Sequence, residues 1–100
     1  MKIDFAQFIT NLDGTVLKNE VNADLTLGML CINAVLASYQ DEGNLAGDEK
    51  VKRYDLALMI HASILPLDLK VEDVALIKKL VAKMYGPLAV GQAWRLLEGE

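Results

Sequence analysis

The longest apolar stretch of the chain runs from Leu27 to Tyr39, and Asn33 and Ser38 are its only polar side chains before the tyrosine. Its apolar residues form two sets at helical spacings, which together cover most of a helical cylinder. Because a helix that is apolar nearly all round must be surrounded by other elements, this stretch predicts the central helix of a small domain. Thr26 is its expected N-cap. A membrane span needs about 20 residues, more than this stretch provides.

Three further helices are expected after a loop over residues 40–47, which contains two glycines and little pattern. The first covers roughly residues 49–63, with Asp48 as its N-cap and Pro66 preventing its continuation. Its apolar residues recur at helical intervals, which predicts one apolar stripe opposite a charged outer face. The stripe consists of Val51, Tyr54, Leu58 and Leu65, widened by Leu56, Met59 and Ile60, and the outer face of Lys50, Lys52, Arg53 and Asp55.

The last two helices are expected over residues 71–85 and 87–98, with Gly86 between them. Acidic residues open the first of these helices and lysines lie in its later turns, an order that suits the helix dipole. Pro87 suits the first position of the second helix. The expected apolar stripes are Val74, Ile77, Val81 and Met84 in the first helix and Leu88, Val90, Ala93, Trp94 and Leu97 in the second.

The N-terminal part of the chain predicts a β-hairpin, because two short apolar arms flank the turn residues 11–14. The Asp-Gly pair in that turn supplies the positive φ that tight hairpins need. A lone hairpin is marginally stable, so we expect it to pack on the helices. The predicted fold is therefore mainly α, with an N-terminal β-hairpin over residues 1–18 packed on a bundle of three to four helices within residues 26–98. We expect a single domain over residues 1–100 and find no internal repeat.

Composition and charge narrow the class of protein. The chain has 100 residues of which 53% are hydrophobic, enough to bury one core. Its net charge is −4, from 10 basic and 14 acidic residues, whereas proteins that neutralise many phosphates are basic. Nucleic acid is therefore not the expected partner. Cys31 is the only cysteine, which excludes an internal disulfide and fits a reducing compartment. We expect neither a signal peptide nor a membrane span.

Three candidates for catalysis have structural explanations. Residues 11–16 resemble the first motif of haloacid-dehalogenase phosphatases, Asp-x-Asp-Gly-Thr, but Asn11 replaces the nucleophilic aspartate and the chain is too short for that fold. His61 is the only histidine, and Cys31 lies between apolar residues with no base nearby in the sequence. We therefore expect no catalytic residue, no metal site and no cofactor, and hence a protein that is not an enzyme.

Aromatic side chains are the remaining candidates for function. Trp, Tyr and Arg are enriched among the residues that carry most of the binding energy of protein interfaces. Trp94 and Arg95 are the first choice, and Tyr85 and Tyr54 complete the predicted protein-binding set.

Three segments of the chain resemble small proteins encoded by tailed bacteriophages and prophages: DLTLGMLCINAVLA, DEKVKRYDLALMI and VEDVALIKKLVAKMYGPLAVGQAW. A hairpin followed by helices is also similar in architecture to the tail assembly chaperones of long-tailed phages. The resemblance implies a role in virion assembly, and a location in the cytoplasm of the bacterial host or in the virion.

The sequence thus predicts a non-enzymatic phage protein that binds another protein, or a second copy of itself, during virion or tail assembly. Two alternatives remain open. The first is an inhibitor of a host or defence protein that uses an acidic surface formed by Asp41, Glu42, Asp48 and Glu49. The second is a small DNA-binding regulator that uses Lys78, Lys79, Lys83 and Arg95.

Overall fold

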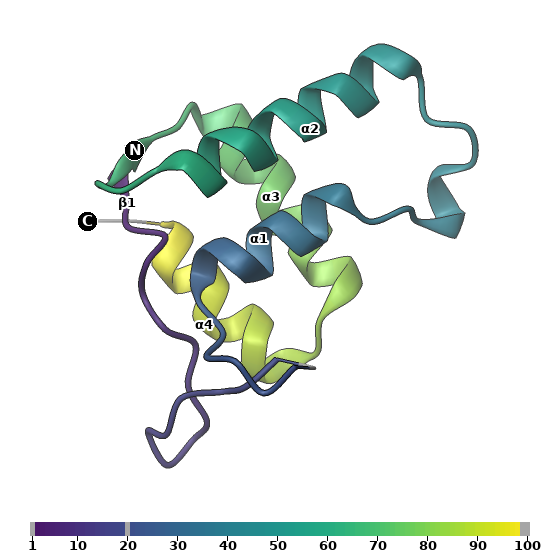
Figure 1. The fold of residues 1–100 in the computed structure, drawn as a ribbon. Helices are drawn as coiled ribbons and strands as arrows, with labels where there is room; N and C mark the ends of the chain where they lie inside the picture. The colour runs from purple at the N-terminus through teal and green to yellow at the C-terminus, as the bar shows by residue number, and fades with distance from the viewer. Residues whose placement is uncertain (1, 20, 99–100) are drawn as a thin grey trace.

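The computed structural model describes residues 2–19 and 21–98, and these form a mainly helical fold with a small antiparallel β element (Figure 1). The predicted fold class is confirmed. The ends of the predicted 1–100 domain, Met1 and residues 99–100, lie outside the described residues. The α-helices are α1 (Leu27–Leu36), α2 (Gly47–Ala62), α3 (Val71–Met84) and α4 (Pro87–Leu97). The short elements are β1 (Lys2–Ile3), the 3₁₀ turn η1 (Gln40–Glu42) and β2 (Leu67–Asp68).

Helix α1 is the centre of the fold. It packs against both α2 and α3, and α4 packs against α3 (Figure 1). Leu30, Cys31 and Ala34 of α1 are fully buried, as the apolar stretch predicts. Gly28 lets the N-terminal segment lie directly on the first turn of α1, since a Cβ there would meet the carbonyl oxygen of Phe5 at 3.1 Å. The Gly28 N–H donates to the same oxygen at 2.8 Å.

The helix ends agree closely with the sequence-based prediction. The Thr26 side chain accepts a hydrogen bond from the Met29 N–H, which confirms it as the N-cap of α1. Pro87 occupies the first turn of α4, as predicted. The prediction of Asp48 as a cap is wrong, because α2 begins at Gly47 with Ala46 as its N-cap. The central helix also ends earlier than predicted, at Leu36.

The regular β ladder joins segments that are far apart in the sequence. β1 pairs antiparallel with β2, so Lys2 lies opposite Asp68 and Ile3 opposite Leu67. The predicted hairpin turn also forms, with Gly14 at φ +90° and a single antiparallel bridge between residues 10 and 16. The N-terminal strand is therefore held by the α2–α3 connection, while the hairpin arms make only isolated bridges.

Two successive turns, described over residues 9–16 and over residues 17–19 and 21–24, share a pattern of backbone hydrogen bonds. The backbone N–H of Ile9 donates to the Leu25 oxygen, that of Leu17 to the Ile9 oxygen and that of Leu25 to the Leu17 oxygen, at 2.8–2.9 Å. This cycle ties three chain segments together. Each turn has an asparagine at its third position and a residue of positive φ at its sixth: Asn11 and Asn19, then Gly14 and Asn22.

Helix α2 confirms the predicted exposure of Lys50, Lys52 and Asp55 but buries a different side from the predicted apolar stripe. Its buried residues are Arg53, Leu56, Ala57 and Ile60. The predicted apolar stripe instead faces outward, with exposed fractions of 58% at Val51, 56% at Tyr54, 47% at Leu58 and 79% at Leu65. Only Leu56 and Ile60 of the predicted apolar set are buried, and Arg53, predicted to lie on the outer face, is 6% exposed. The physical reason is the partner of Arg53, described below.

Candidate functional site

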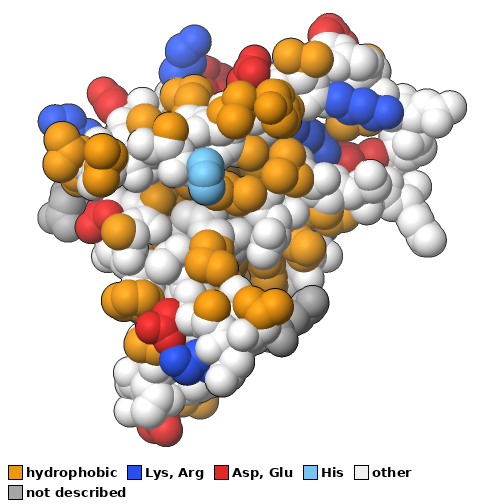
Figure 2. Space-filling model, viewed as in Figure 1, with side chains coloured by type: hydrophobic (Ala, Val, Ile, Leu, Met, Phe, Trp, Pro, Cys, Tyr) orange, Lys and Arg blue, Asp and Glu red, His pale blue; other side chains and the backbone are white. Residues whose placement is uncertain are grey.

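The outward side of α2 carries the most concentrated set of exposed apolar side chains on a single helix. We define the α2 face as the exposed residues Val51, Tyr54, Leu58 and Met59. Figure 2 shows hydrophobic side chains gathered over α2 on the side turned to the viewer. Beyond the end of the helix, Ile64 and Leu65 are 94% and 79% exposed. Monomeric proteins rarely leave large contiguous apolar patches in water, so such a surface is typical of an interaction site.

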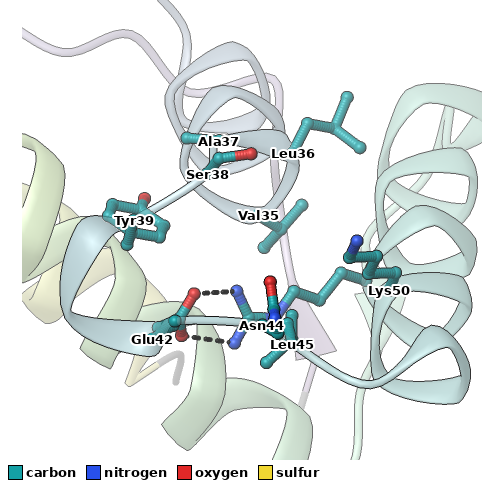
Figure 3. A pocket seen from close by; sticks show the side chains of 11 residues that line it. Val35, Leu36, Ala37, Ser38, Tyr39, Glu42, Asn44, Leu45 and Lys50 are labelled. Atoms are coloured by element: carbon teal, nitrogen blue, oxygen red, sulfur yellow. Dashed lines mark hydrogen bonds and ion pairs between the residues drawn. The ribbon is translucent and has the colours of Figure 1, made fainter.

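The opposite side of α2 is held by a buried ion pair. The Arg53 guanidinium donates two parallel hydrogen bonds to the Glu42 carboxylate, from Nη1 to Oε1 at 2.9 Å and from Nη2 to Oε2 at 2.7 Å (Figure 3). The side chains of Arg53 and Glu42 are only 7% and 12% exposed. Lys83 of α3 approaches the same carboxylate at 3.5 Å and Asp41 at 3.1 Å. These contacts fasten the η1 turn to both α2 and α3.

The ion pair sets the protonation state of Glu42. The hydrogen bonds from Arg53 lower the pKa of the Glu42 carboxyl to about 2, against the opposing effect of burial, and the charges of Arg53 and Lys83 act in the same direction. The same hydrogen bonds raise the pKa of Arg53. Both groups are therefore charged at neutral pH. Arg53 can be buried because this carboxylate neutralises it, which explains why one charged residue lies on the inner side of α2 beside Leu56, Ala57 and Ile60.

A small pocket of about 320 Å³ lies beside this ion pair, between the end of α1, the η1 turn and the first turns of α2 (Figure 3). Lys50 and Asn44 line its rim. Nearby, the Tyr39 hydroxyl donates to the carbonyl oxygens of Ala34 at 2.6 Å and Leu80 at 3.2 Å. Burial of this hydroxyl raises the pKa of Tyr39, and the Glu42 charge adds to the shift. The groups around the ion pair are thus arranged to hold the 40–42 segment in place.

The proposed acidic surface is largely neutralised by cations of the chain itself. Glu42 and Asp41 contact Arg53 and Lys83, and Glu49 lies 4.0 Å from Arg53. Asp48 is exposed in the first turn of α2. Three of the four predicted acidic residues therefore have a cationic neighbour within the fold, which leaves little free negative charge to attract a basic partner.

Two of the four basic residues predicted to contact DNA, Lys78 and Lys83, make contacts within the fold, as does Gln92 of α4. Lys83 bridges to η1, as described above. Lys78 lies over the Trp94 ring, 5.6 Å from its centroid, and 3.6 Å from Glu98. Gln92 pairs with the backbone of Thr10, accepting from its N–H at 2.8 Å and donating to its carbonyl oxygen at 2.6 Å. The two lysines and this amide stabilise the packing of helices and turns.

The structure separates the four residues predicted to bind protein. Trp94 is 40% exposed, and its indole N–H donates to the Lys78 carbonyl oxygen at 3.1 Å, so α4 uses it to hold α3. Arg95 is exposed at a different place, beside a pocket shared with Lys2 and Ile3. Tyr85 is half-buried and lines a groove of about 810 Å³.

Of the four residues, Tyr54 is the one that belongs to the α2 face. Its neighbours on that face, Val51, Leu58 and Met59, were missed as surface residues because their spacing is identical to that of a core stripe. The signal available in the sequence was the helical spacing of Arg53 with Leu56, Ala57 and Ile60, together with Glu42, a possible partner in the preceding loop.

The residues considered for catalysis take structural positions. Cys31 is fully buried and burial raises the pKa of its thiol to about 12, so it stays protonated. Asp13 accepts from the N–H and the hydroxyl of Thr15, which lowers the pKa of Asp13 and fixes the turn. His61 is exposed on α2. Among residues 2–19 and 21–98, no three His, Cys, Asp or Glu side chains are grouped to hold a metal ion.

Within the described part of the chain, no helix has the length and apolar character needed to cross a membrane. Comparison with protein-family models, curated proteins and solved structures found no significant match. The α2 face is the candidate binding surface of the described residues.

Proposed function

We propose that this chain acts without catalysis, by binding another protein through the α2 face. The single observation that carries the proposal is that Val51, Tyr54 and Leu58 are about half exposed on one side of a helix whose other side buries an arginine. An apolar side chain left in water forgoes the stabilisation that burial would give, about 25 cal/mol for each Å². A partner that covers the face restores that stabilisation.

The total surface of the chain supports the proposal. Its accessible area is 6430 Å². A folded monomer of 11.0 kDa is expected to expose about 5,600 Å². The chain therefore exposes more surface than a compact monomer of its mass.

The biological setting of this binding, virion or tail assembly in a bacteriophage, is part of the proposal and rests on the sequence resemblance alone. The two alternatives gain no support from the site geometry. Ion pairs within the fold occupy most of the acidic residues of the inhibitor hypothesis and two of the four basic residues of the DNA-binding hypothesis.

A photo-crosslinking experiment in bacterial cells tests the proposal. A benzophenone amino acid is placed at Leu58 and, as a matched control, at Leu88 of α4, which is 37% exposed compared with 47% for Leu58. We expect irradiation to give one discrete protein adduct at position 58 and none at position 88. The proposal is wrong if position 58 gives no adduct, or if both positions give the same diffuse pattern.

A further inference from the structure

We infer that the partner covering the α2 face is a second copy of this chain, packed antiparallel so that Leu58 lies next to the twofold axis. This inference rests on the proposed function, since it names the occupant of the same surface. It uses the pattern of side chains along α2, the charge of that face and the area that a dimer needs.

The apolar pattern of the α2 face reads the same in both directions from Leu58. Tyr54 and Ala62 lie four residues before and after it, and both are exposed. In an antiparallel pair of helices related by a twofold axis, a residue at a given distance before the axis lies at the level of the residue at the same distance after it on the partner. Tyr54 of each copy would therefore lie at the level of Ala62 of the other, on either side of Leu58.

Charge on this face does not oppose self-association. Val51, Tyr54 and Leu58 follow one another along the helix, and the charged neighbours are of both signs: Lys50, Lys52 and Asp55. Asp55 and His61 lie three residues before and three after Leu58, so Asp55 of one copy lies at the level of the His61 imidazole of the other, which carries a hydrogen-bond donor. The net charge of −4 on each chain adds a general repulsion, which salt screens. We therefore expect the dimer to persist at high salt.

A single twofold contact accounts for the α2 face. A standard interface takes about 800 Å² from each partner, so the contact would cover the α2 face together with neighbouring exposed side chains such as Ile64 and Leu65. A twofold contact uses the same patch on both copies, so one α2 face on each chain is sufficient. Because α2 faces are consumed in pairs, the assembly closes at two copies.

Disulfide trapping tests the arrangement residue by residue. A disulfide needs Cα atoms about 4.4–6.8 Å apart, so only a position close to the twofold axis can cross-link to itself. We expect the Leu58→Cys variant to form a covalent dimer under mild oxidation. Tyr54→Cys and Ala62→Cys should each stay uncross-linked alone and should give a covalent heterodimer when mixed. The native Cys31 is fully buried and does not interfere, and Leu88→Cys serves as the exposed control.

The outcomes separate this inference from the proposed function. Cross-linking of Leu58→Cys to itself, with the 54–62 pair linking only in the mixture, supports the antiparallel dimer. Covalent dimers formed equally well by Leu88→Cys, or self-linking at position 54 without linking at 58, overturn it. If the purified chain forms no dimer but the probe at position 58 captures a different protein in cells, the dimer is wrong and the proposed function stands.

Discussion

The two sides of α2 do not follow the rule that apolar side chains face the core and charged side chains face solvent. The inner side buries a charged residue, Arg53, against a carboxylate, whereas the outer side presents Val51, Tyr54 and Leu58 to solvent. α3 shows the ordinary arrangement, with Val74 and Ile77 buried. Hydrophobic spacing therefore identifies α2 as amphipathic, but the position of ionic partners decides which side faces the core. The α2 face remains exposed as a result and is available to a partner.

A leucine-to-alanine substitution should cost far more stability in the core than on the α2 face. Leu30→Ala removes a fully buried side chain from α1, and we expect it to lower the free energy of unfolding by about 4 kcal/mol because it leaves a cavity. Leu58→Ala on the α2 face should lower the stability of the isolated monomer by less than about 0.5 kcal/mol. Urea denaturation at low protein concentration measures both. Equal losses at the two positions would mean that Leu58 is part of the core.

The inner side of α2 depends on its ion pair. Arg53→Met should lower the free energy of unfolding by about 3 kcal/mol, because the Glu42 carboxylate stays buried with Lys83 as its remaining neighbour. Lys52→Met is the matched control, since Lys52 is exposed on the same helix, and its effect should lie within about 0.5 kcal/mol of zero. Chemical denaturation compares them. If the two variants prove equally stable, Arg53 does not determine which side of α2 is buried.

Acid should weaken the Glu42–Arg53 ion pair on the inner side of α2, whereas the apolar side chains of the α2 face carry no charge that acid could change. The pKa of Glu42 is lowered to about 2 in the folded protein from an ordinary value of 4.5. A lowered pKa means that the stabilisation is fully present above the ordinary pKa and is lost as the pH falls from about 4.5 toward 2. We expect a loss of about 2 kcal/mol from this group.

The matched variant for this pH experiment is Glu42→Gln. It should be less stable than the wild type at neutral pH, and the difference between the two proteins should shrink below pH 4.5, where the wild type loses the charge. Thermal unfolding over this pH range gives the measurement. A constant difference at every pH would show that the pairing does not depend on the Glu42 charge.

The smallest predicted change concerns the hydroxyl that ties the end of α1 to α3. Tyr39→Phe removes the donor to the Ala34 and Leu80 carbonyl oxygens and should lower the free energy of unfolding by about 1 kcal/mol. Tyr54→Phe on the α2 face is the control and should change the stability by less than about 0.5 kcal/mol. A loss at position 54 as large as that at position 39 would place the Tyr54 hydroxyl in the fold.

Most of the helical framework could be predicted from local signals. Thr26 and Pro87 fix the starts of α1 and α4 through the backbone groups they cap or replace, and these signals act within a few residues. The pairing of β1 with β2 could not be predicted, because it joins segments more than 60 residues apart with only two residues in each strand. The similar turns around Asn11 and Asn19 also could not be predicted, because the two asparagines at equivalent positions are too weak a signal in the sequence.

The candidate site was less predictable than the fold. Val51, Tyr54 and Leu58 have the spacing of a core stripe, and spacing alone does not state which side of a helix is buried. Arg53 is buried only because Glu42, in a turn before the helix, reaches its guanidinium. Trp94 is a further example, because its indole N–H is committed to the Lys78 carbonyl oxygen, a contact with no local sequence signal.

The molar mass of the purified chain, measured by sedimentation equilibrium at high salt, tests the central claim most directly. We predict twice the chain mass of 11.0 kDa for the wild type and for Leu88→Glu, and the mass of a single chain for Leu58→Glu. The glutamate at position 58 should weaken the association about 30-fold or more, as expected for a residue at the centre of an interface. A single-chain mass for the wild type, or a dimer that Leu58→Glu leaves intact, would contradict the account.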